Sequence, residues 1–361
     1  MTPLIVGGGP AGAAAAITLA RADVLPHLIE RTSGEHDVVC GGFLGWDALA
    51  LLGRLGIDTT ALGARPITRL RLIAGKRRIE APLPHAAAGL SRRSLDAALL
   101  AAAERAGAEV TRGVTVRSAD PQRRRVRLHD DSEIACDALL LATGKHELRG
   151  VARPLADRRD SLAVGLRAAL PPSPARQAAL ADTIELHLFD QGYAGLLLQE
   201  DGTANLCLSV SQQRLTAAAG PAALLAELAN ELPTLAERLG PDLPAPISAI
   251  AGVPYGWSAG TTTAGLFRLG DQGAVIASLA GDGIAMALAG GIGAAEALLA
   301  EGPDAAEAWQ AGFARRTARQ RRLAEMLRHG AERRLGRAAL MALLRLAPGL
   351  ITPATHLTRT H

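Results

Sequence analysis

The sequence predicts an α/β protein whose first domain is Rossmann-like, and three observations predict it. Residues 4–6 are apolar and strand-favouring, and they lead directly into the glycine-rich stretch 7–12. An alanine-rich run, residues 13–22, follows and favours a helix. A second apolar segment then ends in Glu30. Strand, Gly-x-Gly-x-x-Gly turn, helix, strand and acid, in this order, are typical of a fold that binds a dinucleotide.

Each glycine of the motif has its own physical role in such a fold. Gly7 permits the tight turn, Gly9 lets the backbone approach a pyrophosphate, and Gly12 allows the helix to pack closely on the strand. The free N–H groups of the helix N-terminus then face the phosphates. Glu30 is placed to accept hydrogen bonds from ribose hydroxyls. The alternative is a plain glycine-rich turn between a strand and a helix.

Composition excludes several other classes of protein. The 361 residues carry a net charge of +4 and are enough for two domains. The three cysteines, Cys40, Cys136 and Cys207, lie far apart, so we expect neither a disulfide framework nor a metal site. No zinc-finger spacing or aromatic-interleaved basic motif argues for nucleic-acid binding. The chain opens into a strand without a secretory signal, so we expect a cytoplasmic protein.

The segments up to residue 144 continue the first domain. Residues 38–46 gather a thiol, adjacent glycines and two aromatic residues in one loop, which favours backbone lying close to something flat or bulky. Residues 67–80 alternate as a hairpin, and a helix capped by Ser91 or Ser94 is expected to run to residue 106. Three strands are then expected as a meander, over residues 109–118, 124–128 and 133–143.

The second half divides into a middle block and a return to the first domain. Strand patterns over residues 162–210, helical runs over 221–239 and a last strand over 247–253 indicate an antiparallel sheet with helices. Residues 266–271 then form a strand ending in Gly-Asp, and a long alanine-rich helix follows residue 283. From residue 303 the chain is helical and rich in arginine.

Five motifs in this order resemble one superfamily. They are the glycine motif with Glu30-Arg31; Cys40-Gly41-Gly42; Arg92 before Leu95-Asp96; Ala142-Thr143-Gly144; and Gly270-Asp271 with Gly281-Asp282-Gly283-Ile284. Over residues 1–300 the chain resembles the flavoprotein hydroxylases of the para-hydroxybenzoate hydroxylase type and the related geranylgeranyl-reductase-like oxidoreductases. The resemblance implies an FAD-dependent oxidoreductase.

The resemblance also implies how the chain is divided. We expect an FAD-binding domain of the GR2 type, with a central parallel sheet and a β-meander, from residues 1–66, 89–155 and 258–302. Residues 67–88 and 156–257 are expected to form an antiparallel-sheet substrate domain. Residues 303–361 are expected to form a C-terminal helical tail.

The resemblance assigns FAD contacts residue by residue. Arg92 reaches the pyrophosphate or the flavin side chain, Val116 touches adenine, and Asp271 holds the ribityl chain. Gly283 and Ile284 lie by the flavin pyrimidine ring, at a helix N-terminus that can stabilise negative charge on reduced flavin. The full set of expected cofactor-binding residues is Gly7, Gly9, Ala11, Gly12, Glu30, Arg31, Cys40, Arg92, Val116, Ala142, Gly144, Asp271, Gly283 and Ile284.

A substrate pocket is expected where scarce aromatic residues meet the flavin. Trp46, Tyr193, Tyr255 and Trp257 lie in or beside loops that the resemblance places near the cofactor, and Cys40 is expected to close the pocket. Cys40 and Tyr193 are the candidate catalytic residues. The alternative is that the aromatic residues fill core, and that Cys40 is a small buried thiol.

Two reactions and one other class of protein follow from these residues. The substrate is expected to be small and largely apolar, aromatic or isoprenoid-like, and to undergo flavin hydride transfer to a C=C bond or flavin-hydroperoxide monooxygenation. The resembling hydroxylases usually carry a Gly-x-Asp-Gly stretch, but residues 142–149 stand in its place here. This departure favours hydride transfer to a C=C bond. Whether NAD(P)H is the electron donor stays open. The alternative class is a flavin-free binding protein, similar to the dissociation inhibitors, for a lipidic ligand.

The basic tail suggests a further partner. Many arginines lie after residue 312, either as a solvated helix face or as a contact with anionic lipid. Peripheral membrane association through the C-terminal helices therefore stays open beside a cytoplasmic location.

Overall fold

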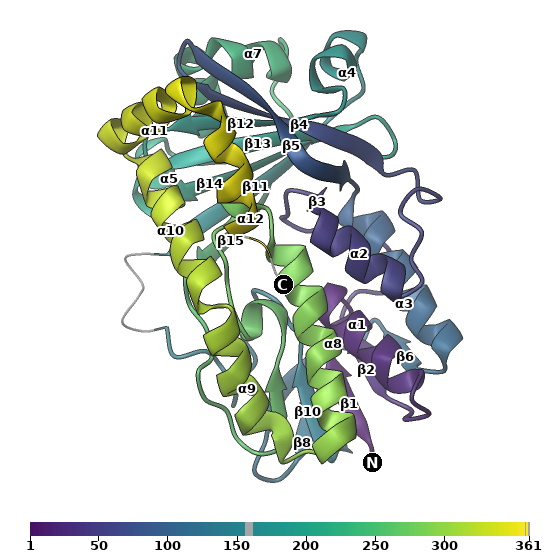
Figure 1. The fold of residues 1–361 in the computed structure, drawn as a ribbon. Coiled ribbons are helices and arrows are strands. Elements are labelled where there is room, and N and C mark those ends of the chain that lie inside the picture. Colours follow the sequence, from purple (N-terminus) through teal and green to yellow (C-terminus); the bar gives the residue numbers. More distant parts are fainter. Residues whose placement is uncertain (156–161, 358, 360–361) are drawn as a thin grey trace.

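The computed structural model describes residues 1–155, 162–357 and 359. Its strands form three sheets, here called sheets A, B and C, and most of the helices pack on their faces (Figure 1). Sheet B lies at one end of the molecule and sheet A at the other, and helix α8 (Gly283–Glu301) begins between them (Figure 1). The expected α/β fold class is confirmed.

Sheet A is the parallel sheet that the glycine motif predicts. Its five strands pair in parallel throughout. Their order is β16 (Leu266–Arg268), β10 (Ala138–Leu141), β1 (Pro3–Val6), β2 (His27–Glu30) and β6 (Glu109–Arg112). Strands β1 and β10 are buried along their whole length because helices or the meander cover both faces. The turns after β1, β10 and β16 therefore meet at one edge of the sheet.

Three helices cover one face of sheet A. Helix α1 (Pro10–Ala20) is almost wholly buried because its alanines allow close approach of α8 and α3 (Arg92–Ala106). A side chain at Gly291 would collide with the Ala11 carbonyl group, so α8 lies directly against α1. Helix α8 is long and apolar enough to cross a membrane, but this packing makes it a core helix.

Sheet C is the expected β-meander, but its first and last strands have other bounds than those predicted from the sequence. It contains β7 (Val116–Asp120), β8 (Arg125–Leu128) and β9 (Glu133–Ala135). The prediction of continuous strands over residues 109–118 and 133–143 is wrong, because residues 109–112 and 138–141 form strands of sheet A. Gly113 has a φ of +77° and turns the chain between β6 and β7. The meander covers the second face of sheet A.

Sheet B has eight strands and is mixed rather than wholly antiparallel. Among the described strands of sheet B, only β4 and β12 pair in parallel, and the other neighbouring strands pair antiparallel. Long connections through sheet A separate β4 from β12 in sequence, so no tight turn fixes an antiparallel pairing. The order is β15 (Ser248–Val253), β11 (Ala163–Leu170), β14 (Ala204–Ser211), β13 (Gly192–Leu198), β12 (Thr183–Phe189), β4 (Arg65–Ala74), β5 (Arg77–Gly89) and β3 (Phe43–Leu44).

The two faces of sheet B contact different parts of the molecule. On β14, Leu206, Leu208 and Val210 pack into a core with helices α4 (Pro174–Leu180), α6 (Pro221–Glu231) and α7 (Pro233–Leu239). The alternate residues of β14 therefore face the other way. The Asn205 amide donates to the carbonyl oxygens of Cys40 and Gly41, so this second face meets the loop from the first domain.

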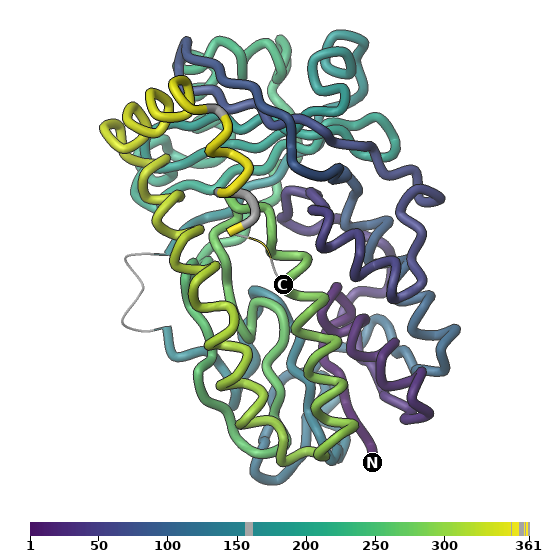
Figure 2. The backbone as a smooth tube through the Cα atoms, viewed as in Figure 1, coloured from purple at the N-terminus to yellow at the C-terminus, as the bar shows by residue number. Residues whose placement is uncertain are grey.

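The C-terminal segment is helical, as expected, and it joins the two ends of the molecule. Helix α9 (Ala305–Arg316) packs on α8 and β16, and α10 (Ala318–Glu332) reaches β12 and β13. Figure 2 shows this path along one side of the molecule. Helices α11 (Arg334–Leu346) and α12 (Ile351–Leu357) then contact β5. The expected domain ranges stay a prediction, and residues 156–161, where the middle range begins, lie outside the described residues.

Candidate active site

The glycine turn has the geometry that a bound pyrophosphate needs. Gly7 has a φ of +108°, and a side chain there would collide with the Ala142 carbonyl group. A side chain at Gly12 would collide with the Gly7 carbonyl group, which holds α1 close to the end of β1. Gly9 differs, because a Cβ atom there would meet only Arg92 Nη2, at 3.3 Å. Space beside Gly9 at the start of α1 is thus lined by a cation.

Glu30 is held in position by its own loop. Its Oε2 accepts a hydrogen bond of 2.7 Å from the Gly8 N–H, and its Oε1 accepts from the N–H and hydroxyl of Thr32. Burial raises the pKa of Glu30, but these hydrogen bonds outweigh it and leave the pKa below the usual value. The carboxylate therefore stays ionised at neutral pH. It lines a pocket with Gly8, Gly9 and Thr32, where an adenosine ribose would fit.

Arg92 forms the side of the site opposite the glycine turn. It begins α3, which Ser91 caps, and its guanidinium binds Asp96 in bidentate fashion at 2.8 and 2.7 Å. Asp96 helps to raise the pKa of Arg92 despite its burial. Sequence reasoning missed Asp96 as the group that orients Arg92, although its i,i+4 spacing was visible.

The turns after β10 and β16 bring opposite charges together. Lys145 follows Gly144, and its Nζ lies 3.0 Å from Asp271 Oδ2, on the short helical turn η2 (Gly270–Gln272). The attraction of Asp271 raises the pKa of Lys145 even though burial opposes it. Adjacent parallel strands place these turns side by side, so Lys145 fixes the carboxylate expected to hold the ribityl chain. The sequence analysis did not assign Lys145 a role.

Helix α8 presents its N-terminus at the junction of the two sheets. Its N-cap residue, Asp282, is fully buried and makes no capping bond to α8. Asp282 instead accepts from Gln320 of α10, and Arg359 Nη1 lies 3.5 Å from its Oδ1. Arg359 also donates to the Gly281 carbonyl oxygen at 3.2 Å. The C-terminal segment therefore fastens the turn that carries Gly283 and Ile284.

Both tyrosines of the chain meet at one serine. The hydroxyl of Tyr193, from β13, is hydrogen-bonded to Ser278 Oγ, and Tyr255 Oη lies 2.6 Å from the same oxygen. Burial raises the pKa of Tyr193 well above 10 and also raises the pKa of Tyr255. Both hydroxyls therefore carry their protons at neutral pH. Ser278 was not among the expected site residues, and it begins the short helical turn η3 (Ser278–Ala280), five residues before the first residue of α8.

The face of β14 that lies beside Tyr193 carries a row of polar side chains, here called the polar stripe. Asn205, Cys207 and Ser209 alternate with the leucines that face the helices. In register, Ser209 lies opposite Tyr193. Burial raises the pKa of Cys207 to about 12, so this thiol is not a nucleophile at neutral pH. The period-two alternation of residues 204–210 was the sequence signal that could have found this stripe.

The two expected pocket tryptophans each pack against a cation and other rings or apolar side chains. Trp257 packs with Val253, Ala259 and Val275, and the Arg153 guanidinium lies 5.5 Å from its ring centre. Tyr255 packs against the same cluster and so links it to Ser278. The Trp46 ring lies 5.2 Å from the His85 ring and 4.6 Å from the Arg359 guanidinium. Trp46 thus stands beside the start of α8, and its role in substrate binding stays a prediction.

Two further expected residues lie at the edge of the site. Arg31 is exposed and its Nη2 lies 2.8 Å from His146 Nε2. Val116 is half-buried in the meander, and its side chain packs toward sheet A. Their contacts with a cofactor stay a prediction.

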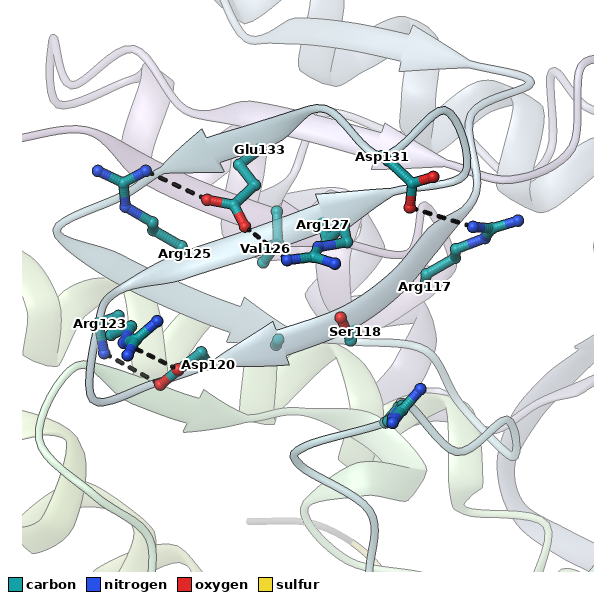
Figure 3. Close-up of a pocket in the computed structure, with 11 residues that line it drawn as sticks. Arg117, Ser118, Asp120, Arg123, Arg125, Val126, Arg127, Asp131 and Glu133 are labelled. Atoms are coloured by element: carbon teal, nitrogen blue, oxygen red, sulfur yellow. Dashed lines mark hydrogen bonds and ion pairs between the residues drawn. The ribbon is translucent and has the colours of Figure 1, made fainter.

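A second hollow, on the meander, is a surface of paired charges. Figure 3 shows Glu133 between Arg125 and Arg127, with Asp131 on Arg117 and Asp120 on Arg123. These side chains are mostly exposed, and the hollow lacks the glycines and tyrosines that mark the site. Within the described residues no cluster of His, Cys, Asp and Glu is suited to a metal ion.

The arrangement fits an extended dinucleotide. A Cβ atom at Gly41, Gly144 or Gly283 would meet no atom of the described residues within 4 Å. These three glycines belong to the Cys40 loop, the turn after β10 and the start of α8, which surround the junction between the sheets. Open space beside these glycines, together with the pocket at Gly9 and Glu30, is here called the cradle, where FAD would lie.

Comparisons with known proteins agree with this geometry. Residues 1–153 match the family of pyridine nucleotide-disulphide oxidoreductases. No curated protein sequence matches the chain.

Solved structures with the same fold cover nearly the whole chain. The flavin-dependent brominase Bmp2 is 16% identical, with a TM-score of 0.78 over 99% of this chain and 93% of that one. A geranylgeranyl bacteriochlorophyll reductase-like protein from Thermoplasma acidophilum is 19% identical, with a TM-score of 0.72 over 93% and 89%. The halogenase PltM, solved with phloroglucinol and FAD, is 14% identical, with a TM-score of 0.74 over 90% and 75%.

Proposed function

We propose that this chain, which has the fold of the FAD-dependent oxidoreductases, reduces a carbon–carbon double bond in a largely apolar, aromatic or isoprenoid-like molecule. The family match and the flavin-dependent structural relatives support an FAD-dependent enzyme. Gly9, Arg92 and Glu30 would hold the adenosine diphosphate part of FAD. Asp271 and the start of α8 would hold the part that carries the flavin ring.

The observation that carries the proposal is the pairing of Tyr193 and Tyr255 on Ser278. Reduction of a double bond adds two electrons and two protons in total, so one carbon receives a hydride equivalent and its neighbour receives a proton. When bound and reduced by an electron donor such as NAD(P)H, FAD would supply the hydride equivalent. A buried tyrosine hydroxyl with a raised pKa is protonated at neutral pH and is suited to deliver the proton.

Ser278 gives the tyrosine pair a way to replace the proton. Because Ser278 Oγ contacts both hydroxyls, a proton given up by one tyrosine can be supplied through the serine from the other. Ser278 is exposed, so solvent can then reprotonate the pair. Leu279, beside Ser278, and Tyr193 belong to one apolar cluster at this end of the site. An apolar substrate would gain from burial against the same side chains.

Monooxygenation is the second candidate reaction. Proteins with similar folds include flavin-dependent halogenases as well as a reductase-like protein, so the fold is compatible with both reactions. A flavin-free binding protein for a lipidic ligand is not favoured by the relatives. The open cradle, Glu30 and the Asp271–Lys145 pair also support a cofactor.

The experiment that tests the proposal separates the two reactions by their need for oxygen. The FAD-loaded protein is reduced chemically under nitrogen and mixed with apolar isoprenoid or aromatic compounds that contain a double bond. Return of the oxidised flavin absorbance without oxygen, with a saturated product, supports reduction. Reoxidation only after oxygen is admitted, with a hydroxylated product, contradicts it. Reduction of the resting flavin by NADH and by NADPH, compared with and without substrate, identifies the donor.

A further inference from the structure

We propose that the outer face of α11 docks on an anionic membrane surface. The face consists of Leu335, Ala339, Ala342, Leu343 and Leu346, and is here called the outer stripe. Leu335, Leu343 and Leu346 are 85%, 52% and 86% exposed. A leucine is seldom left so open in a folded protein, and three on one short helix form a contiguous apolar patch.

Helical geometry places these residues together. At about 3.6 residues per turn, the five positions of the outer stripe fall on one side of α11. Met341 and Leu344 are buried and hold the opposite side of the helix against the protein. Helix α11 is therefore apolar on two sides, and only one of them is covered within the described residues. Figure 1 shows α11 at the periphery of the molecule, beyond α10.

The charges beside the outer stripe identify the partner. The sequence from residue 333 to the end contains five arginines and no aspartate or glutamate. Arg337 pairs with Asp190, and Arg359 is buried at the start of α8. Arg333, Arg334 and Arg345 are exposed, and no ion pair is described for them. Exposed leucines edged by arginines suit the boundary between acyl chains and anionic headgroups.

The same charges argue against a second copy of the chain as the occupant. Two outer stripes brought face to face would place the arginines of both copies close together, and like charges repel across such a contact. Two of the arginines of α10 do not contribute in the way that the basic sequence suggested. Arg321 is buried and donates to the Gly256 and Ala314 carbonyl oxygens, and Arg328 is buried between Glu325 and Glu332.

Docking through α11 would bring the candidate active site close to the bilayer. The buried side of α11, with Met341 and Leu344, belongs to the apolar cluster that contains Tyr193 and Leu279. The buried side of α11 and the tyrosine expected to act on substrate therefore share one apolar core. This consequence, delivery of an apolar substrate from the membrane, rests on the proposed function, whereas the docking itself does not.

The test is sedimentation of the full-length protein with lipid vesicles, without substrate. We expect binding to vesicles of phosphatidylcholine and phosphatidylglycerol in equal amounts, little binding to phosphatidylcholine alone, and loss of binding as salt is raised. The double variant Leu335→Ser/Leu346→Ser should weaken binding on the order of tenfold or more. Leu25→Ser is the matched control, because Leu25 is 72% exposed and lies on the loop between α1 and β2.

A second pair of variants separates charge from apolar contact. Arg334→Gln/Arg345→Gln should weaken binding and reduce its salt dependence, whereas Arg54→Gln on α2 (Trp46–Arg54) should leave both unchanged. Absence of binding to the anionic vesicles, or binding that the leucine variant retains in full, would overturn the proposal. A concentration-dependent dimer that the leucine variant abolishes would also overturn it in favour of a second copy. Because no turnover is measured, these outcomes leave the proposed reaction to its own test.

Discussion

Lys145 Nζ lies 3.0 Å from Asp271 Oδ2, and this pair joins the turns that follow two neighbouring strands of sheet A. The contact ties the Ala142-Thr143-Gly144 motif to the Gly270-Asp271 motif. The pair is therefore expected to support the cofactor through the orientation of Asp271.

Replacement of Lys145 tests this relationship. Lys145→Met should lower FAD affinity about tenfold, because a charge-assisted contact contributes roughly 1.5–3 kcal/mol. Lys145→Arg keeps the charge and should recover most of the affinity. Titration of the apoprotein with FAD, followed by flavin fluorescence, measures both. Equal affinity of the methionine variant and the wild type would show that Asp271 needs no partner.

Glu30 offers a test at the adenosine end of the site. Glu30→Ala should reduce FAD affinity on the order of tenfold or more, since it loses charge-assisted hydrogen bonds. Glu30→Gln keeps the shape of the side chain and should reduce it less. Glu104→Gln, on the exposed side of α3, is the control and should change nothing. If the alanine variant bound FAD as tightly as the control, the ribose assignment of Glu30 would be wrong.

The pH dependence of Glu30 follows from the direction of its pKa shift. The folded pKa lies below the usual 4.5, so the stability that ionised Glu30 contributes is fully present above pH 4.5. It is lost as the pH falls through the folded pKa. The difference in unfolding free energy between wild type and Glu30→Gln should therefore be constant near neutral pH and shrink below pH 4.5. Urea unfolding over this pH range measures it, and a difference that grows in acid would contradict the assignment.

The tyrosine pair makes a prediction about rate rather than binding. Tyr193→Phe and Tyr255→Phe should each lower the reduction rate roughly a hundredfold, with FAD content unchanged, because a positioned acid contributes about that much or more. Ser278→Ala should have a smaller effect. Since burial raises the pKa of both tyrosines above 10, tyrosine ionisation should not reduce the rate at any pH below 10. A full rate for both phenylalanine variants would remove the pair from the mechanism.

Arg359 makes a prediction about the role of the chain end. The guanidinium lies between the Trp46 and Phe43 rings, at 4.6 and 5.5 Å from their centres, and next to buried Asp282. Arg359→Ala should destabilise the protein by roughly 3 kcal/mol, because it leaves a buried carboxylate without this cation. It should also weaken FAD binding through the turn before α8. Urea unfolding and FAD titration measure the two effects, with exposed Arg54→Ala as the control. A variant with unchanged stability would contradict this role.

The sequence was a good guide where structure depends on local geometry. Gly7, Gly9 and Gly12 have separate roles that a strand-turn-helix unit imposes, and the structure shows a matching environment for each. The hairpin of β4 and β5 and the cap at Ser91 were also local and correct. The break between β6 and β7 was missed because Gly113 looks like any other strand-end residue until the register of both sheets is known.

Long-range contacts were the part that sequence reasoning could not supply. Tyr193 and Tyr255 were expected in one pocket, but Ser278, which joins them, lies in an apolar stretch with no motif of its own. Trp46 and Trp257 were expected in the same pocket because aromatic residues are scarce, and their part in substrate binding stays a prediction. Arg359 contacts Asp282 only because α9 to α12 return the chain to the site, and no spacing in the sequence reports such a return.

The central claim is that the cradle around Gly9, Gly41, Gly144 and Gly283 holds FAD. The most direct measurement is the absorbance spectrum of the purified protein, followed by identification of the released cofactor after denaturation. The account predicts a yellow protein that releases FAD rather than FMN, or a colourless apoprotein that takes up FAD in a one-to-one ratio. A colourless protein that fails to bind FAD on reconstitution would contradict it.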